Sequence, residues 1–305
     1  MWLGEARESV PLSSRRIGDD MSIEFRAVTK RFPDGTVAVD DFSLVIPAHK
    51  TTVFVGSSGC GKTTLLRMIN RLIEPTAGEI TIDGDSILDR DPVRLRRGIG
   101  YVLQNSGLLP HFTVADNIAT VPVLGGTPKR VARERALELL DIVGLDRALA
   151  DRYPRQLSGG QQQRVGVARG LAADPNILLM DEPFGAVDPI VRKELQAETR
   201  RLQRDLDKTV VFVTHDIDEA FLLGDQVVIL QKGAQIAQVG NPDEIIENPA
   251  NDFVADFVGL ERGARALRTK HTPRGTVLID DSGRTQGVLV GEAPASEPPA
   301  SEDRA

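Results

Sequence analysis

The chain has 305 residues, of which 41% are hydrophobic and 27% charged, a composition that is ordinary for a folded protein with a sizeable core. Its 37 basic and 44 acidic residues give a net charge of −7, which argues against nucleic acid as a partner. The single cysteine, Cys60, excludes an intramolecular disulfide, and no run of 18 apolar residues predicts a membrane span.

The N-terminal segment, residues 1–21, carries mixed charge and lacks the apolar stretch of a secretory signal. We expect it to be a disordered extension. Between Ile23 and Val55 come short β-rich runs, separated by turn-like sequences at 33–35 and 47–50. These runs predict an antiparallel β subdomain.

A glycine-rich loop follows the strand-like run 51–55 and precedes a helical pattern, and it fits G-x-x-x-x-G-K-[ST]. In this motif, called the P-loop below, backbone N–H groups converge on phosphate oxygens and the helix start adds a favourable dipole. We expect Lys62 to reach the β and γ phosphates and Thr63 to bind Mg²⁺. Cys60 is expected to be a small loop residue rather than a nucleophile, because no base partner can be inferred beside it. The predicted nucleotide-binding residues here are Gly56, Ser57, Ser58, Gly59, Cys60, Gly61, Lys62, Thr63 and Thr64.

Two further strand-like runs, EITID and IGYVLQ, lead into a segment with helical periodicity at about 113–155. Within it, Val131, Leu137, Leu140 and Val143 are predicted to share one face of a helix. The segment therefore predicts a helical subdomain inserted into an α/β core. After it, apolar strands alternate with helices, which predicts a largely parallel sheet covered by helices.

Two acidic residues, Asp181 and Glu182, end the apolar strand 177–180. Burying two carboxylates there without a use would be costly, and a metal ion with a water molecule would explain them. The alternative is a pair of helix N-cap residues after the strand.

The pentapeptide Leu-Ser-Gly-Gly-Gln at 157–161 lies between the P-loop and this acidic pair. The ordered trio closely resembles the ABC ATPases, over about residues 22–260. The resemblance implies an α/β fold with a P-loop NTPase ABC ATPase core, an antiparallel β subdomain and an inserted helical subdomain. It also implies ATP and Mg²⁺ as cofactors, with Asp181 holding Mg²⁺ and Glu182 acting as the general base on water.

In ABC ATPases the pentapeptide, called the signature below, caps the γ-phosphate of an ATP held by the opposite subunit. The resemblance therefore implies that Ser158, Gly159, Gly160 and Gln161 complete a site on another chain. One chain with one P-loop and one signature holds halves of two sites. A homodimer, or a pairing with a similar ATPase subunit, follows.

Four single residues match the family at the expected places in the chain. Gln104 is implied to sense Mg²⁺ and the nucleophilic water, and His215 to contact the γ-phosphate. Asp188 is implied to lie in the loop that communicates across the dimer. Phe32 is implied to stack on adenine, although it could equally be a core residue of the antiparallel sheet. With Glu182 and Lys62, Gln104 and His215 make up the predicted catalytic set.

The chain also resembles the separate ATPase subunit of a bacterial importer, which works with permease and solute-binding subunits at the cytoplasmic face of the membrane. Longer sequence segments, such as EPFGAVDPIVRKELQAE and VTHDIDEAFLLGDQVVILQKG, resemble those of the osmoprotectant group. These importers take up glycine betaine, carnitine, choline or proline-type solutes. The alternatives are an importer ATPase for another cargo, such as a sulfonate or an amino acid, and a non-transport ABC ATPase.

The C-terminal residues 261–305 are expected to be a mostly disordered tail, rich at its end in Pro, Ala, Ser and acidic residues. Within the tail, residues 276–291 predict two strands around a turn. The osmoprotectant group often carries a pair of CBS regulatory modules after the ATPase, and this strand-turn-strand resembles a remnant of one. The alternative is a short surface hairpin.

Overall fold

The computed structural model describes residues 22–104, 106–185, 192–193, 196–197, 199–201, 207–260, 268–272, 275–279 and 284–289. The chain divides into two units, residues 1–245 and 246–305. Of the sequence predictions, the disordered extension at 1–21 and the Pro-rich end after residue 289 lie outside the described residues.

An antiparallel sheet opens the first unit. Its strands are β1 (Ile23–Arg31), β2 (Val37–Ile46), β4 (Ala77–Ile82) and β5 (Asp85–Ser86), in the order β2-β1-β4-β5. Apolar residues along β1 and β2 point to one face and are buried there, as a half-buried antiparallel sheet requires. The predicted antiparallel β subdomain is therefore present.

A six-stranded sheet forms the centre of the unit, in the order β10-β9-β3-β8-β7-β6. Neighbouring strands are parallel except for the β9–β10 pair. The strands are β3 (Thr51–Gly56), β6 (Ile99–Val102), β7 (Ile177–Asp181), β8 (Thr209–Thr214), β9 (Gln226–Gln231) and β10 (Gln235–Gly240). β3, β7 and β8 are buried along their whole lengths, which explains their continuous apolar sequences. The predicted, largely parallel sheet is confirmed.

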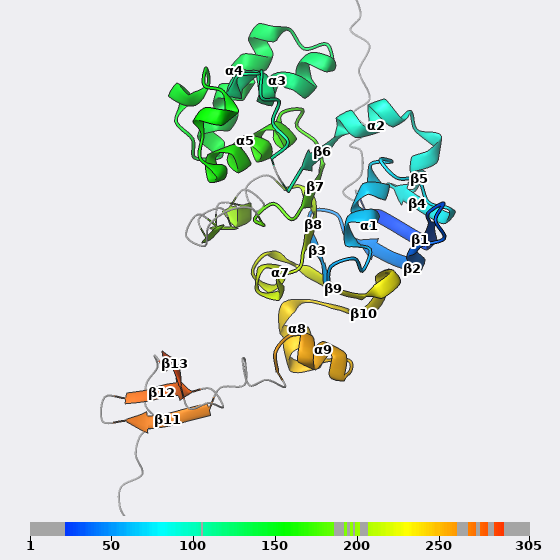
Figure 1. Ribbon diagram of the computed structural model, residues 1–305, viewed down its shortest axis with the longest axis vertical. Helices are drawn as coiled ribbons and strands as arrows, with labels where there is room; N and C mark the ends of the chain where they lie inside the picture. Colours follow the sequence, from blue (N-terminus) through cyan, green and yellow to red (C-terminus); the bar gives the residue numbers. More distant parts are fainter. Residues whose placement is uncertain are drawn as a thin grey trace, which may run out of the picture. The chain divides into compact units, whose positions relative to one another are not determined.

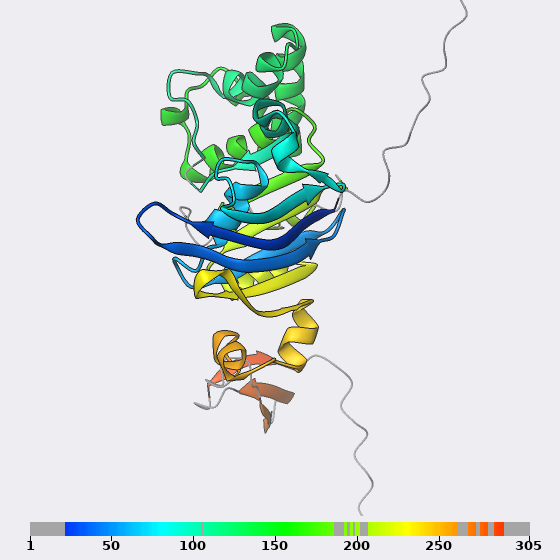
Figure 2. The ribbon, with the colours of Figure 1, turned by 90° about the vertical axis from the view of Figure 1, so that its right-hand side faces the viewer.

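The main core lies between the two sheets, with helix α1 (Lys62–Ile69) beside it (Figure 1). Phe42 of β2 is packed edge-to-face against Phe25 of β1 and Phe54 of β3, with ring centroids 5.2 and 6.1 Å apart. Such pairs add to the hydrophobic burial of each ring. This packing fixes the antiparallel sheet on the strand that leads into the P-loop. Figure 2 shows the antiparallel sheet in front of the central sheet.

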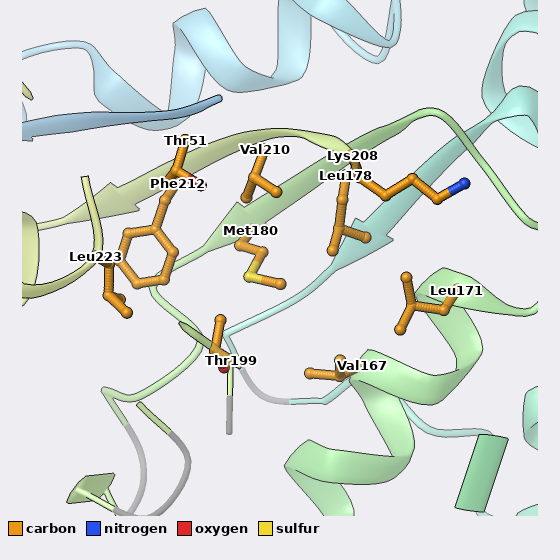
Figure 3. A pocket seen from close by; sticks show the side chains of 10 residues that line it. All are labelled: Thr51, Val167, Leu171, Leu178, Met180, Thr199, Lys208, Val210, Phe212 and Leu223. Atoms are coloured by element: carbon orange, nitrogen blue, oxygen red, sulfur yellow. The ribbon is translucent and has the colours of Figure 1, made fainter. Parts of the chain in front are cut away.

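The other face of the central sheet carries α5 (Gly159–Leu171) and α7 (Ile217–Leu223). Figure 3 shows a mainly apolar cavity on this face, lined by side chains of α5, β7, β8 and α7. Lys208 lines it with its methylene stem, while its ammonium group points away and reaches a carboxylate oxygen of Asp174 at 2.9 Å. The cavity thus stays apolar although a lysine borders it.

A helical subdomain contains α3 (Val114–Leu124) and α4 (Lys129–Ile142), which lie within the predicted segment at about 113–155. It also includes α5, which follows that segment and packs against both helices. The predicted buried face of α4 is wrong in part, because Val131 is 42% exposed and Leu137 is only half-buried. The buried positions instead follow a helical repeat in which small residues take part. They are Ala132, Ala136, Leu139, Leu140 and the C-cap Val143.

The remaining elements of the first unit are short. They are α2 (Pro92–Gly98) and the 3₁₀ turns Ile87–Asp89, Arg147–Leu149, Pro154–Gln156 and Lys232–Ala234. Helix α8 (Pro242–Glu247) contains the boundary between the two units. Among the helices of the described residues, none is both long and apolar enough to cross a membrane.

The second unit contains α9 (Asp252–Phe257) and an antiparallel sheet of β11 (Arg268–Thr272), β12 (Gly275–Ile279) and β13 (Thr285–Val288). The sequence predicted the β12–β13 hairpin but not β11, whose polar sequence RTKHT has little strand signal of its own. Because β11 pairs residue for residue with β12, the neighbouring apolar strand explains its extended conformation.

Gly100 of β6 lets α5 approach the central sheet closely. A Cβ at this position would lie under 3.0 Å from the Gly170 carbonyl oxygen and from a Leu178 methyl carbon. We expect Gly100→Ala to lower the free energy of unfolding by about 1–3 kcal/mol, because the neighbours are backbone and core atoms that yield at a cost. Gly98→Ala is the matched control, since its Cβ would meet nothing within 4 Å. Equal denaturant midpoints for the two variants would contradict the expectation.

Candidate active site

The predicted site residues follow the carboxyl ends of neighbouring parallel strands. The P-loop follows β3, Gln104 follows β6, Asp181 and Glu182 end β7, and His215 follows β8. Adjacent strands are in register at this edge, since Asp181 pairs with Val213. In open α/β sheets ligands bind at this edge, so the topology itself gathers the residues.

The P-loop needs glycine at two positions because its backbone passes close to other strands. A Cβ on Gly56 would lie under 3.0 Å from the Leu230 carbonyl oxygen, and one on Gly61 equally close to the Ala38 carbonyl oxygen. Gly61 also has φ +115°, a conformation that favours glycine. Cys60 is buried between them, where it fills space as a small loop residue.

Lys62 is the buried cation of this loop. Its ammonium group donates hydrogen bonds to the Gly56 carbonyl at 2.8 Å and the Ser57 carbonyl at 2.9 Å. Ser57, Ser58 and Gly59 are exposed at the rim of the loop. The ammonium therefore lies beneath a backbone loop that is open to solvent. An anion on that loop would meet both the N–H groups and a positive charge.

Thr63 and Asp181 face each other across the start of α1 and the end of β7. The Thr63 hydroxyl donates to the Asp181 carboxylate at 3.0 Å. Asp181 is buried, and its second oxygen lies 3.3 Å from the Tyr101 hydroxyl and 3.5 Å from the Arg67 guanidinium. Sequence reasoning missed Arg67 and Tyr101, although both lie within six residues of predicted site residues.

This pair of oxygen ligands fits Mg²⁺, which prefers one or two protein oxygens together with phosphate and water. The described residues hold no group of three or more His, Cys, Asp or Glu arranged for a metal ion, so a cage made by the protein alone is not offered there. Burial raises the pKa of Tyr101, so its phenol stays protonated and donates to Asp181 at neutral pH. These contacts fix the position of the Asp181 carboxylate.

Glu182 is the residue on which the other site residues converge. Its Oε2 accepts a hydrogen bond from Gln104 Nε2 at 3.2 Å and lies 3.3 Å from His215 Nδ1. Its backbone has φ 44°, a strained conformation for a residue other than glycine, while its N–H donates to the Val213 carbonyl at 3.0 Å. The turn thus lifts the carboxylate out of the strand and towards Gln104 and His215.

The solvent exposure of these three side chains determines whether they could take part in proton transfer from water. The Glu182 side chain is 23% exposed and that of His215 is 62% exposed, and Gln104 is exposed as well. A carboxylate that is partly sheltered, and that has two polar neighbours open to solvent, can accept a proton from a positioned water. The structure therefore brings Glu182, Gln104 and His215 together beside the Mg²⁺-type site at Asp181.

The signature starts helix α5 through a capping box. Ser158 Oγ accepts from the Gln161 N–H at 3.2 Å, and Gln161 Oε1 accepts from the Ser158 N–H at 3.0 Å. Ser158 and Gly159 are exposed, and the hydroxyl of Ser158 keeps its own proton to donate outwards. The segment forms a well-capped helix start rather than the weak one that its Ser-Gly-Gly sequence suggests.

Two of the remaining predicted residues are Phe32 and Asp188. Phe32 is half-buried, with the Lys30 ammonium 5.4 Å from its ring centroid, so it is not enclosed in the core of the sheet. Its stacking on adenine stays a prediction. Asp188 lies outside the described residues.

Comparison with known proteins gives consistent similarities. Residues 39–185 match the family described as ABC transporter. The chain is 55% identical over 240 residues to the glycine betaine/carnitine/choline transport ATP-binding protein OpuCA of Bacillus subtilis, which covers 79% of this chain and 63% of that protein. It is 47% identical to the glycine betaine uptake system ATP-binding protein YehX of Escherichia coli, covering 90% and 87% respectively. The chain thus spans about six tenths of the length of the first curated relatives it matches.

A solved structure extends the comparison to the fold. A dimeric ATP-binding cassette in a post-hydrolysis state, bound to ADP and Pi, is 35% identical with a TM-score of 0.65. The match covers 72% of this chain and 98% of that one. The predicted fold class and the predicted resemblance are both confirmed.

Proposed function

The chain belongs to the family of ABC transporter ATP-binding proteins, and on that premise we propose that it hydrolyses ATP to drive an importer of quaternary-amine osmoprotectants. The cargo is of the glycine betaine, choline, carnitine or proline type. The hydrolytic part of the proposal is carried by the convergence of Gln104 and His215 on the Glu182 carboxylate. The cargo is supported by the names of relatives 47–56% identical to this chain.

In the proposed reaction, two copies of the chain hold two ATP molecules, each between a P-loop and the partner's signature. Lys62 binds the β and γ phosphates. Thr63 and Asp181 would hold Mg²⁺, which would offset negative charge on the phosphate oxygens. Glu182 accepts a proton from the attacking water, Gln104 orients that water, and His215 contacts the γ-phosphate. The Ser158 hydroxyl and the N–H groups of the α5 start close the site from the partner chain.

Coupling to transport requires a surface that a permease can contact. We place this surface at a groove of about 560 Å³ in the helical subdomain, close to Gln104 in the chain. The groove is lined mainly by apolar residues together with a few charged ones. Its lining includes Leu109, Phe112, Val123, Leu124, Lys129 and Arg133. Movement of this subdomain with the Gln104 segment would pass closure of the dimer to the permease.

The proposed assembly is a homodimer, or a pair with a similar ATPase subunit, on the cytoplasmic face of the membrane. Permease subunits anchor it there, and a solute-binding protein contributes indirectly. No nucleic acid takes part.

Uptake of labelled solutes under high salt tests the proposal. A strain lacking the gene should lose most uptake of glycine betaine, choline, carnitine or proline, and the wild-type gene should restore it. The Glu182→Gln gene, expressed to the same level, should not. Unchanged uptake of all four, or a loss confined to a sulfonate or an amino acid other than proline, would refute the proposed cargo.

A further inference from the structure

Glu219, in the first turn of α7, is a buried acidic residue that the proposed reaction does not use. It is 6% exposed. Its Oε2 accepts a hydrogen bond from the Thr214 hydroxyl at 2.6 Å, and its Oε1 accepts one from Gln196 Nε2 at 3.1 Å. Arg192 Nε lies 4.0 Å from the same Oε1. A carboxylate with this many side-chain partners has more than the helix-dipole role of an exposed acidic residue at a helix start.

The contact with Thr214 reaches the backbone on both sides of His215. The Thr214 hydroxyl donates its only proton to Glu219 and accepts a hydrogen bond from the Asp216 N–H at 3.0 Å. The Asp216 carboxylate in turn accepts from the Glu219 N–H at 3.3 Å. These hydrogen bonds, made by the Glu219 side chain and backbone, therefore close the turn that contains His215.

The contact with Gln196 leads to a different part of the chain. Arg192 and Gln196 are helical residues that come after the acidic pair of β7, far in sequence from α7. Residues from both parts of the chain line a small pocket. Its lining includes Glu182, Arg192, His215 and Glu219. The Glu219 carboxylate thus connects the helical residues Arg192 and Gln196 to the part of the site that contains His215.

We propose that Glu219 is a positioning residue: by joining Thr214 to Gln196, it holds the His215 turn at the Glu182 carboxylate. The inference rests on the proposed ATP hydrolysis. It also accounts for a buried acidic residue where an apolar one of similar size would give equal or greater stability. Glu219 acts through Thr214 and His215 and touches no reacting atom.

ATP hydrolysis by the purified full chain tests the role. Glu219→Ala removes both hydrogen bonds, and we expect turnover to fall at least tenfold while KM for ATP stays within about twofold. A small misplacement of a catalytic group costs rate rather than substrate binding. Glu219→Gln should retain turnover within about threefold, because an amide can still accept from Thr214 and bond to a flipped Gln196. The matched control is Asp218→Asn, an exposed acidic residue of the same helical turn.

A double-mutant cycle tests the path through the hydroxyl. Thr214→Val should lose about as much turnover as Glu219→Ala, and the double variant should be little worse than either. Independent losses that multiply would overturn the proposed path. Glu219→Ala with turnover within threefold of wild type and a lowered Tm would show a purely structural role and overturn the inference. If the wild-type chain itself failed to hydrolyse ATP, the proposed function would fail first, so the two failures are distinguishable.

Stability measured against pH checks that Glu219→Gln is folded. Burial, and then the nearby Asp216 charge, raise the pKa of Glu219, against the opposing effects of Thr214, Arg192 and Gln196. A carboxyl whose folded pKa is raised contributes stability below its unfolded pKa and loses it as pH rises through the folded pKa. The Tm of Glu219→Gln should therefore rise relative to that of wild type as pH increases from about 4.3, the ordinary pKa of Glu, towards neutrality. A Tm difference that does not change over this range would contradict the expectation.

Discussion

Glu182→Gln is expected to lower ATP turnover by about 10²- to 10⁴-fold while ATP stays bound, the range associated with loss of a general base. The amide has nearly the shape of the carboxylate, so the turn at φ 44° and the approach of Gln104 and His215 should persist. What is lost is the ability to accept a proton from water. Because binding is intact and hydrolysis is not, the variant should accumulate as an ATP-bound dimer.

Turnover is measured with a coupled phosphate-release assay, and the dimer by size-exclusion chromatography with light scattering, with and without ATP. Glu138→Gln is the control, since Glu138 is exposed on α4 and its salt bridge with Arg135 contributes little. Retention of more than half of wild-type turnover by Glu182→Gln would refute the assignment of Glu182 as the base. Loss of ATP binding would show instead that the carboxylate supports the fold of the site.

The order of motifs predicted the cluster around Glu182 because Gln104, Asp181, Glu182 and His215 each lie at or just after the end of a strand. When strands are parallel and neighbours in one sheet, their carboxyl ends meet, so Gln104, Asp181 and His215 had to converge. The strands themselves were visible because strands buried on both faces are continuous apolar runs. For these residues, local sequence and topology point to the same arrangement.

Other features depend on contacts that no local pattern carries. Glu219 looks like an ordinary acidic residue at a helix start, and only the tertiary contacts with Thr214 and Gln196 show that it is buried. The buried face of α4 differs from the predicted one because two of its positions are the alanines Ala132 and Ala136, whose small side chains give a weak apolar signal in the sequence. The polar strand β11 is explained by its pairing rather than by its composition.

Lys62→Ala is expected to weaken ATP binding itself, by about 10- to 100-fold in Kd. Lys62 is 5% exposed and its ammonium is held by the Gly56 and Ser57 carbonyls, so it is already positioned under the loop before an anion arrives. A charge-assisted hydrogen bond contributes about 1.5–3 kcal/mol, which corresponds to this change in affinity. Calorimetric titration of the full chain with ATP and Mg²⁺ measures the Kd directly, with Lys270→Ala, an exposed lysine of the second unit, as the control.

The two variants separate binding from chemistry. Lys62→Ala should bind ATP poorly and so form little ATP-dependent dimer, whereas Glu182→Gln should form more of it than wild type. In the proposed dimer the signature of one chain completes the site of another, so dimer formation is expected to report on occupancy of the P-loop rather than on hydrolysis. If Lys62→Ala bound ATP as tightly as wild type, the buried ammonium would act mainly within the loop, through Gly56 and Ser57, and its phosphate-binding role would be refuted.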